Sequence, residues 1–486
     1  MHQAYAIFVV SYVNYIMNEM NKSLFFSILL CSIFISSVSY AGGILTNTNQ
    51  SAHFIRMVAR DASLQIDAVY TNPAGLVKLN DGFHISFTNQ SAFQTRTITS
   101  TFAPFKGFGG NEIKEFKGDA SAPVIPSFQG AYKTGKWVLS GSFAVSGGGG
   151  KATFNHGLPS FESLIATLPV AISSMDVPTD QYSVDAYMRG SSFIYGAQLG
   201  GSYAINDMFS VYAGFRLNVV NNHYEGYLKN IRINPRHPLI NPEGRMMPAS
   251  DFLNAAGQSG LAELTADREI DNKQSGWGIS PILGFNFNYE RLNVGMKYEF
   301  RTSLNLESKT IDGKDGGLPQ FKDGVNTPHD IPALFTVGAS YQITPQLLAS
   351  VGYHHFFDSD AEMADDKQQF INGGINEYLA GAEYRISRLF LVSAGVQFTR
   401  SGVTDDYQKD LSFSLDSYSI GLGGAVNVSK NVTINIGYFW TDYADWTVSK
   451  EHYTSVAGSN PPVYLPGKDV FSRTNKVFAA GVDFSF

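Results

Sequence analysis

Three things are scarce in this chain: charge, cysteine and long apolar runs. Charged residues make up 16% of its 486 residues, against about 25% in ordinary soluble domains. The net charge of -7 provides no basic surface, so we expect no nucleic-acid partner. A single cysteine, Cys31, excludes a disulfide framework and a thiolate metal site. After residue 41 no apolar run is long enough for a membrane-spanning helix.

The start of the chain carries an export signal. Lys22 precedes an apolar stretch over 24–35, and Ser39-Tyr40-Ala41 has the small-x-small pattern of a cleavage site. We therefore expect residues 1–41 to be a removed signal peptide with an over-extended start, leaving Gly42 first in the mature chain. A lipoprotein site at Cys31 is the weaker alternative, because no small residue precedes it.

Aromatic residues and glycine are abundant instead, with 36 Phe, 25 Tyr and 47 Gly, which suits strands and tight turns. From residue 82 onward, segments alternate with a period of two. In 292–301, for example, Leu, Val, Met, Tyr and Phe share one face, while Asn, Gly, Lys, Glu and Arg share the other. A soluble sandwich also alternates. Here, however, very short turns join paired strands and long polar segments separate the pairs, which is typical of a transmembrane β-barrel.

The sequence thus predicts an all-β fold, a transmembrane antiparallel β-barrel of about 14 strands with both ends in the periplasm. The expected strands are 82–100, 126–133, 137–146, 181–203, 208–228, 276–288, 292–308, 331–342, 347–357, 376–386, 389–401, 411–426, 432–448 and 474–486. The expected extracellular loops are 103–125, 147–180, 229–275, 309–330, 358–375, 402–410 and 449–473. The last strand ends at Phe486 with aromatic residues on one face. It resembles the recognition signal of outer-membrane barrels, so we expect the outer membrane of a Gram-negative bacterium.

Residues 42–81 precede the barrel and contain no good transmembrane strand. Irregular backbone cannot lie in lipid, because its amides would stay unsatisfied. A barrel of this width needs filling, so we expect an N-terminal hatch in the lumen. Asn72-Pro73-Ala74-Gly75 ends this segment: proline restricts Asn72 to extended or turn geometry, and Gly75 permits a positive φ. A stiff turn there would redirect the chain from the hatch into the first strand.

The signal peptide, this segment and a barrel ending in phenylalanine together resemble the FadL/TodX family of outer-membrane transporters for long-chain fatty acids and aromatic hydrocarbons. Ala59-Arg60-Asp61-Ala62-Ser63 and Asn72-Pro73-Ala74-Gly75 carry the match. Ile44 stands where the family usually has an aromatic residue. The resemblance implies passive uptake: extracellular loops capture a hydrophobic compound, the hatch rearranges, and the compound leaves sideways through the wall near a kinked third strand.

The expected third strand, 137–146, contains Gly141 and continues into Gly147-Gly148-Gly149-Gly150. Glycine weakens strand pairing and permits kinks. A flexible entry into the next loop explains the same residues equally well.

Two expected loops carry a helical pattern, Ser160–Ile172 and Ser250–Arg268, the second with Ser250 as its expected N-cap. Mutual packing of these helices over the barrel is one interpretation. The other is an apolar capture groove, since exposed apolar surface usually marks a binding site. The candidate groove residues are Phe161, Leu164, Ile165, Leu168, Phe252, Leu253, Leu261 and Leu264.

Strand parity turns Arg216, Lys297 and Arg385 toward the lumen, where a cation could bind the carboxylate of a fatty acid. Structural ion pairs, Lys297 with Glu299 and Glu383 with Arg385, are the alternative for any one of them. Arg216 has no acidic neighbour on its own strand face, so it is the preferred anion contact.

No motif for nucleotide binding, ester hydrolysis or zinc-dependent proteolysis is present. We therefore expect no enzyme, no cofactor and no metal site. Three functions stay open: passive uptake of hydrophobic compounds, a receptor for haem or another small ligand using His354 or His355, and a general porin. The expected partners are a hydrophobic small molecule and outer-membrane lipid, with the protein as a monomer.

Overall fold

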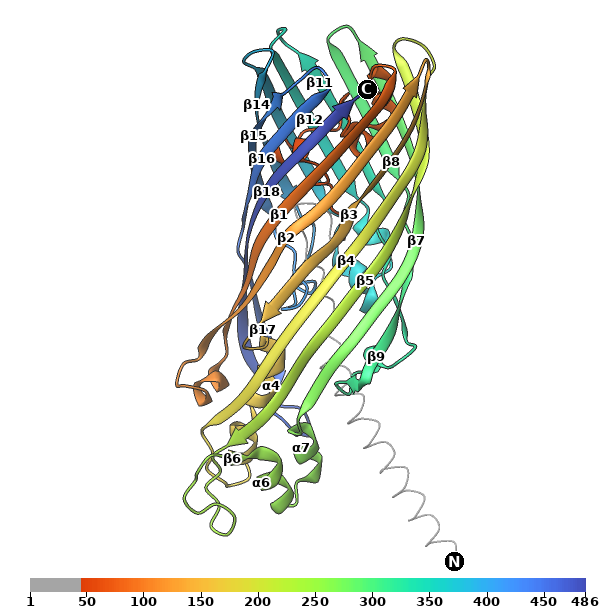
Figure 1. The fold of residues 1–486 in the computed structure, drawn as a ribbon. Helices are drawn as coiled ribbons and strands as arrows, with labels where there is room; N and C mark the ends of the chain where they lie inside the picture. The colour runs from red at the N-terminus through yellow and green to blue at the C-terminus, as the bar shows by residue number, and fades with distance from the viewer. Residues whose placement is uncertain (1–44) are drawn as a thin grey trace, which may run out of the picture.

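The computed structural model describes residues 45–486, which form a closed antiparallel β-barrel of 14 strands (Figure 1). The predicted fold class is confirmed, whereas the expected signal peptide 1–41 lies outside the described residues. β1 pairs with β18 and closes the sheet. The wall strands are β1 Gly82–Thr101, β2 Ile113–Thr134, β3 Trp137–Phe154, β4 Tyr182–Ala204, β5 Phe209–Ile233, β7 Arg268–Tyr289, β8 Leu292–Glu299, β11 Leu334–Gln342, β12 Leu347–Phe356, β13 Asn376–Arg385, β14 Phe390–Arg400, β15 Ser417–Asn427, β16 Val432–Tyr443 and β18 Tyr464–Ser485.

The wall is polar inside and apolar outside. Along β5, Ser210 and Asn218 are buried in the lumen, while Val211 and Phe215 are exposed on the outer face. The same alternation, with the apolar set outward, recurs along the other wall strands. An apolar exterior is costly in water but suits lipid, so the pattern fits a barrel whose solvent is a membrane.

Short turns lie at the end of the barrel that holds the C-terminus, and long loops with most of the helices lie at the opposite end (Figure 1). The loops contain the short strands β6 Met247–Pro248, β9 Asn305–Asp315, β10 Asn326–Pro328 and β17 Trp446–Ser455. Their helices are η2 Ala103–Gly107, α4 Pro159–Ala166, α5 Leu168–Ser173, α6 Ala249–Ala255, α7 Ser259–Leu264, η3 Pro319–Phe321, η4 Asp358–Asp360 and η5 Ala364–Phe370. None of the helices in residues 45–486 has the length and apolar character to cross a membrane.

Several expected boundaries are wrong, mostly because the ladders continue past the point where apolar alternation fades. β2 begins inside the expected loop 103–125, β3 ends inside 147–180, and β5 and β7 both extend into 229–275. β9 extends into 309–330, and β17 and β18 occupy much of 449–473. Three expected strands are instead too long. The expected strand 292–308 breaks between β8 and β9, 432–448 breaks between β16 and β17, and β15 begins only at Ser417, not 411.

The segment before β1 lies inside the barrel. From Leu45 to Val77, every residue except Leu64 and Gln65 is buried. It contains α2 Ala52–Arg56, α3 Ala68–Thr71 and the 3-10 helix η1 Pro73–Lys78. α2 packs against β15, β16 and β18, and η1 packs against β4, β5 and β7. The segment therefore bridges opposite sides of the lumen, and we refer to residues 45–81 as the hatch segment.

Candidate functional site: a gap in the wall and the segment that fills the lumen

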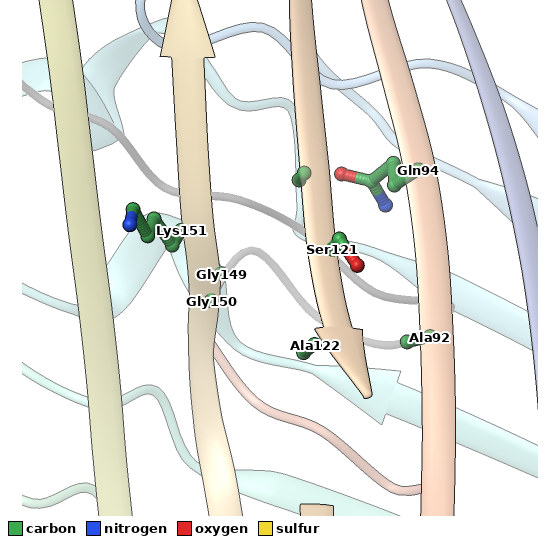
Figure 2. A pocket seen from close by; sticks show the side chains of 8 residues that line it. Ala92, Gln94, Ser121, Ala122, Gly149, Gly150 and Lys151 are labelled. Atoms are coloured by element: carbon green, nitrogen blue, oxygen red, sulfur yellow. The ribbon is translucent and has the colours of Figure 1, made fainter. Parts of the chain in front are cut away.

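One seam of the wall is interrupted. β2 and β3 pair from Gly118↔Phe154 to Ala120↔Ala152, and pairing resumes only at Phe128↔Phe143. Figure 2 shows the two strands diverging at a pocket in this gap. The pocket is lined by Ala92, Gln94, Ala120, Ser121, Ala122, Gly149, Gly150 and Lys151. Most of these side chains are small, and the cavity that they line has a volume of about 10 Å³.

The sequence explains the interruption. In the gap β2 contains Pro123 and Pro126, which have no backbone N–H to donate to a ladder. On the other side, β3 has two register shifts against β4, and Gly148 and Gly150 adopt positive φ of 81° and 68°. Only glycine takes this conformation without strain. The kinked third strand is thus present, whereas Pro123 was missed because 103–125 was assigned to a loop, and Pro126 was the first residue of an expected strand.

The first described residues of the hatch segment take the place of the missing strand partner. Asn47 N donates to the Ser146 carbonyl at 2.8 Å, and Gly148 N donates to the Leu45 carbonyl at 3.2 Å. A Cβ on Gly147 would collide with the Leu45 carbonyl. We refer to residues 45–50 as the arm. It satisfies backbone groups that the gap would otherwise leave unpaired.

The Asn72-Pro73-Ala74-Gly75 turn is bonded to a continuous part of the wall, the strands that follow β3. Asn72 Nδ2 donates to Asn286 Oδ1 of β7 at 2.7 Å. Ser202 Oγ of β4 donates to the Pro73 carbonyl, and Ser210 Oγ of β5 donates to the Ala74 carbonyl, both at 2.7 Å. Three neighbouring strands thus hold one turn, which makes it an anchor of the hatch segment.

Gly75 is required for a reason other than the expected one. It does not adopt a positive φ. A Cβ at this position would instead overlap the Asn72 side chain and press on Leu64 and the Ser63 carbonyl. Asn72 Nδ2 also donates to that carbonyl at 3.0 Å. Gly75 therefore makes room for the amide that fastens the turn.

Buried ion pairs fix the middle of the hatch segment. Arg60 makes two bonds to Asp67, Nε to Oδ2 at 2.7 Å and Nη2 to Oδ1 at 2.8 Å. Glu383 of β13 accepts from Arg56 at 2.5 Å and from Arg60 at 2.9 Å. The expected pair of Glu383 with Arg385 does not form. The Arg385 side chain is exposed at the short-turn end, where it is a poor lumenal anion contact.

Arg216 is paired with a carboxylate, although it has no acidic neighbour on its own strand face. Its Nη1 lies 2.5 Å from Glu299 Oε2, which also pairs through Oε1 with Lys297 Nζ at 2.6 Å. Glu299 is on β8, separated from β5 by β7, so the sequence neighbours of Arg216 could not reveal it. The expected Lys297–Glu299 pair is present. Tyr70 of the hatch segment covers both cations, with its ring centroid 4.8 Å from Arg216 Cζ and 3.9 Å from Lys297 Nζ.

His354 lies between two carboxylates. Its Nε2 is 2.8 Å from Asp61 Oδ1 of the hatch segment, and its Nδ1 is 2.7 Å from Glu377 Oε2 of β13. Neither ring nitrogen is available to a haem iron. Nδ1 of His355 lies 2.9 Å from Asn376 Oδ1. The contacts of His354 therefore favour a structural role over the haem alternative.

The structure brings the candidate groove residues together. Phe161, Ile165, Leu168, Phe252, Leu253 and Leu261 are buried in one apolar cluster, with Leu164 and Leu264 partly buried against it. Aromatic residues of the loops and strand ends, including Phe102, Phe413 and Phe471, belong to the same cluster. The helices thus pack on one another, and a groove exists only if this cluster opens. Ser250 is not the N-cap, because α6 begins at Ala249 with Pro248 before it.

Two buried arginines beside this cluster were missed. Arg96 of β1 and Arg473 of β18 are direct cross-strand partners, and both face the lumen. Arg96 lies over the Phe413 ring and Arg473 over the Tyr443 ring, each with Cζ 5.4 Å from the centroid. Arg473 Nη2 donates to Gln94 Oε1 at 3.0 Å. Strand parity would have identified Arg96, whereas Arg473 was missed because 449–473 was expected to be a loop.

A buried lysine from the loop side adds to this positive charge. Lys367 of η5 donates to Ser412 Oγ at 2.6 Å and lies 3.9 Å from the Tyr407 ring centroid. Burial lowers its pKa well below the usual value, and Lys409 and Arg96 act in the same direction, against Asp365 and Asp410. A bound anion would stabilise the charged ammonium. We refer to Arg96, Arg473 and Lys367 as the cationic cluster.

No protein-family model and no curated protein sequence matches the chain. Solved structures do. A FadL homologue from Pseudomonas aeruginosa is 13% identical with a TM-score of 0.62, covering 93% of this chain and 100% of that one. The chain has the FadL/TodX-type fold. The Pseudomonas putida toluene transporter TodX is 15% identical with a TM-score of 0.51, covering 87% and 94%. A TodX variant lacking S2 and S3 is 14% identical with a TM-score of 0.55, covering 90% and 99%.

Proposed function

We propose that this FadL/TodX-type barrel lies in the outer membrane and takes up hydrophobic compounds passively, releasing them sideways through the gap between β2 and β3. The gap is the observation that carries the proposal. A wall opening lined mostly by small side chains serves no purpose in an aqueous pore, but it gives an apolar solute a path into lipid. The likeness to structures described as a FadL homologue and a toluene transporter supports the same assignment.

The physical reason for a lateral route is solvation. Each buried CH₂ gains about 0.8 kcal/mol on leaving water, so an apolar compound enters a water-filled channel unfavourably. The apolar cluster around α4–α7 would capture the compound on opening. The hatch segment occupies the lumen below it, which disfavours the general porin. Movement of the arm away from β3 would then expose the gap.

The cationic cluster points to an acidic headgroup on the preferred compound. Three cations stand at the edge of the apolar cluster. A fatty acid would place its carboxylate there and its chain among the buried aromatic residues. A charged hydrogen bond contributes about 1.5–3 kcal/mol, so Arg473→Met should weaken fatty-acid binding about 10–150-fold.

Binding of a long-chain fatty acid and of a neutral alkane, each followed by fluorescence displacement, tests this headgroup assignment. The alkane should bind Arg473→Met as it binds the parent protein. Arg385→Met is the matched control, because Arg385 is exposed at the far end of the barrel. Equal losses for both ligands would refute a carboxylate contact while leaving hydrophobic uptake untouched.

Lateral release is tested by filling the gap. Ala122 lines the opening, and Ala122→Trp should reduce uptake of radiolabelled fatty acid and toluene by proteoliposomes to the level of empty vesicles. Ala213→Trp is the control, because Ala213 is a small residue on the exposed outer face of the wall and lies on an unbroken seam. Normal uptake by the folded Ala122→Trp barrel would exclude this exit.

A further inference from the structure

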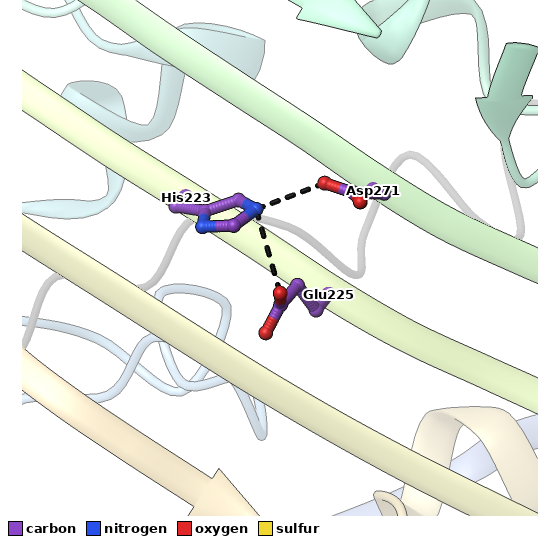
Figure 3. A group of neighbouring side chains, drawn as sticks. All are labelled: His223, Glu225 and Asp271. Carbon is purple, nitrogen blue, oxygen red and sulfur yellow. Dashed lines mark hydrogen bonds and ion pairs between the residues drawn. The ribbon is translucent and has the colours of Figure 1, made fainter. Parts of the chain in front are cut away.

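Three polar side chains converge on the outer face of the wall, away from the lumen (Figure 3). His223 Nε2 lies 2.9 Å from Asp271 Oδ1 and 3.7 Å from Glu225 Oε1. His223 and Glu225 are two residues apart on β5, so they share a face. Asp271 of β7 is the direct cross-strand partner of Glu225. One imidazole nitrogen therefore faces a carboxylate oxygen from each of two strands.

The spacing of these atoms fits a small divalent cation. Ligands bound to zinc at about 2.0–2.1 Å in a tetrahedron are about 3.3 Å apart. The two observed separations, 2.9 and 3.7 Å, lie on either side of this value. One imidazole and two carboxylates are also a donor set that zinc accepts, with a fourth position left for water. Small side-chain rotations would complete the site.

Arg189 of β4 orients one of the carboxylates. Its Nη1 lies 3.1 Å from Glu225 Oε2, whereas the other oxygen, Oε1, faces His223. Arg189 thus binds Oε2 of Glu225 and leaves Oε1 for the cation. Glu225 and Asp271, directly opposite each other, repel, and a cation between them removes that repulsion. Outer partners that fix a ligand in this way commonly tune metal affinity.

The cluster lies where an aqueous ion can reach it. The outer face of β5 is apolar from Phe209 to Val219 and becomes polar at Asn221, on the side of the long loops. Trp277, the cross-strand partner of Val219, marks the same boundary on β7. The three side chains are 25–32% exposed. They stand just beyond the apolar band, in water but beside the wall.

We propose that His223, Glu225 and Asp271 form a binding site for a divalent transition-metal ion of the zinc class, which ties β5 to β7 on the outer surface. Lys273, the exposed cross-strand partner of His223, adds a second positive charge to that face beside Arg189. The site faces outward, away from the lumen, and the single strand β4 separates it from β3 at the gap. It uses no residue of the proposed transport route.

Zinc titration by isothermal calorimetry tests the site, using full-length protein without an affinity tag, stripped of metal in detergent. We expect one saturable site in the parent protein that is lost in both His223→Asn and Asp271→Asn. Arg189→Gln should weaken binding about 10–100-fold, and Lys273→Gln should tighten it. His452→Asn is the control, because His452 is exposed and makes an edge-to-face contact with Tyr464, with ring centroids 4.6 Å apart.

Each variant must first show the heat-modifiable gel mobility of a folded barrel, and Asp271→Asn carries the test if His223→Asn does not assemble. The absence of saturable zinc binding in the parent protein would overturn the proposal. Zinc binding that survives in folded His223→Asn and Asp271→Asn would do so too. Binding of calcium but not zinc would identify a carboxylate site for a hard cation and would equally refute the zinc-class assignment.

Discussion

Two seams of the same wall differ sharply. β5 and β7 pair without a register shift from Phe209↔Phe287 to Leu228↔Arg268. β2 and β3 lose their pairing between Ala120 and Phe128. The continuous seam is rich in Phe, Val, Ile and Leu, which pack well on a pleated surface. It also contains Pro281 and several glycines, yet its register is unbroken. The broken seam differs in having two prolines close together on β2, Pro123 and Pro126, and glycines of positive φ on β3, Gly148 and Gly150.

The hatch segment also makes different contacts at the two seams. Its last turn is hydrogen-bonded to β4, β5 and β7 through side chains of the wall. Its arm replaces a strand partner at the broken seam, mainly through backbone bonds to β3. Between them, Arg56 and Arg60 are held by Glu383. A segment fixed at its middle and at its last turn can release its arm without leaving the barrel.

The largest effect on stability is expected at the fixed middle. Glu383→Gln leaves two buried arginines without their shared carboxylate, and breaking a buried ion pair costs about 3–5 kcal/mol. We expect faster hydrogen exchange over residues 52–67 and a lower unfolding temperature. Glu115→Gln, at an exposed site, should change neither. If hydrogen exchange of the hatch segment is the same in Glu383→Gln as in the parent protein, the ion pairs do not fix this segment. The arm and the last turn then need not differ in mobility.

A smaller effect is expected at the anchored turn. Asn72→Ala removes two buried hydrogen bonds, to the Ser63 carbonyl and to Asn286 Oδ1, and unpaired buried groups cost about 1–3 kcal/mol. We expect a folded barrel with a lower unfolding temperature and raised ion conductance in planar bilayers. Failure of the barrel to assemble would instead make the turn an architectural requirement of the unbroken seam. Thr71→Ala is the control, because its hydroxyl bonds only within the hatch segment, to the Asp67 carbonyl at 3.2 Å.

The sequence predicted the strands of the wall well but most of the lumenal contacts poorly, and the difference has a physical reason. Strand alternation is local, so the fourteen strands could be predicted and Lys297–Glu299, two residues apart, could be paired. The partner of Arg216 lies two strands away in the wall, and the partners of Glu383 lie in the hatch segment. No periodicity encodes such distant contacts. The helical pattern likewise identified the residues of the apolar cluster but could not say that they pack on one another.

The smallest effect on stability, with the clearest effect on gating, is expected at the arm. Gly147→Ala places a methyl group on the Leu45 carbonyl, so the arm should leave β3 while the rest of the hatch segment stays bonded. The unfolding temperature should hardly change, because few contacts are lost, whereas ion conductance and hydrophobic uptake should both rise. Gly201→Ala is the matched control, since its new Cβ would meet only the Val138 carbonyl, at 3.7 Å. Should Gly147→Ala abolish uptake instead, the arm must stay seated for transport, and the broken seam would be a binding surface instead of an exit.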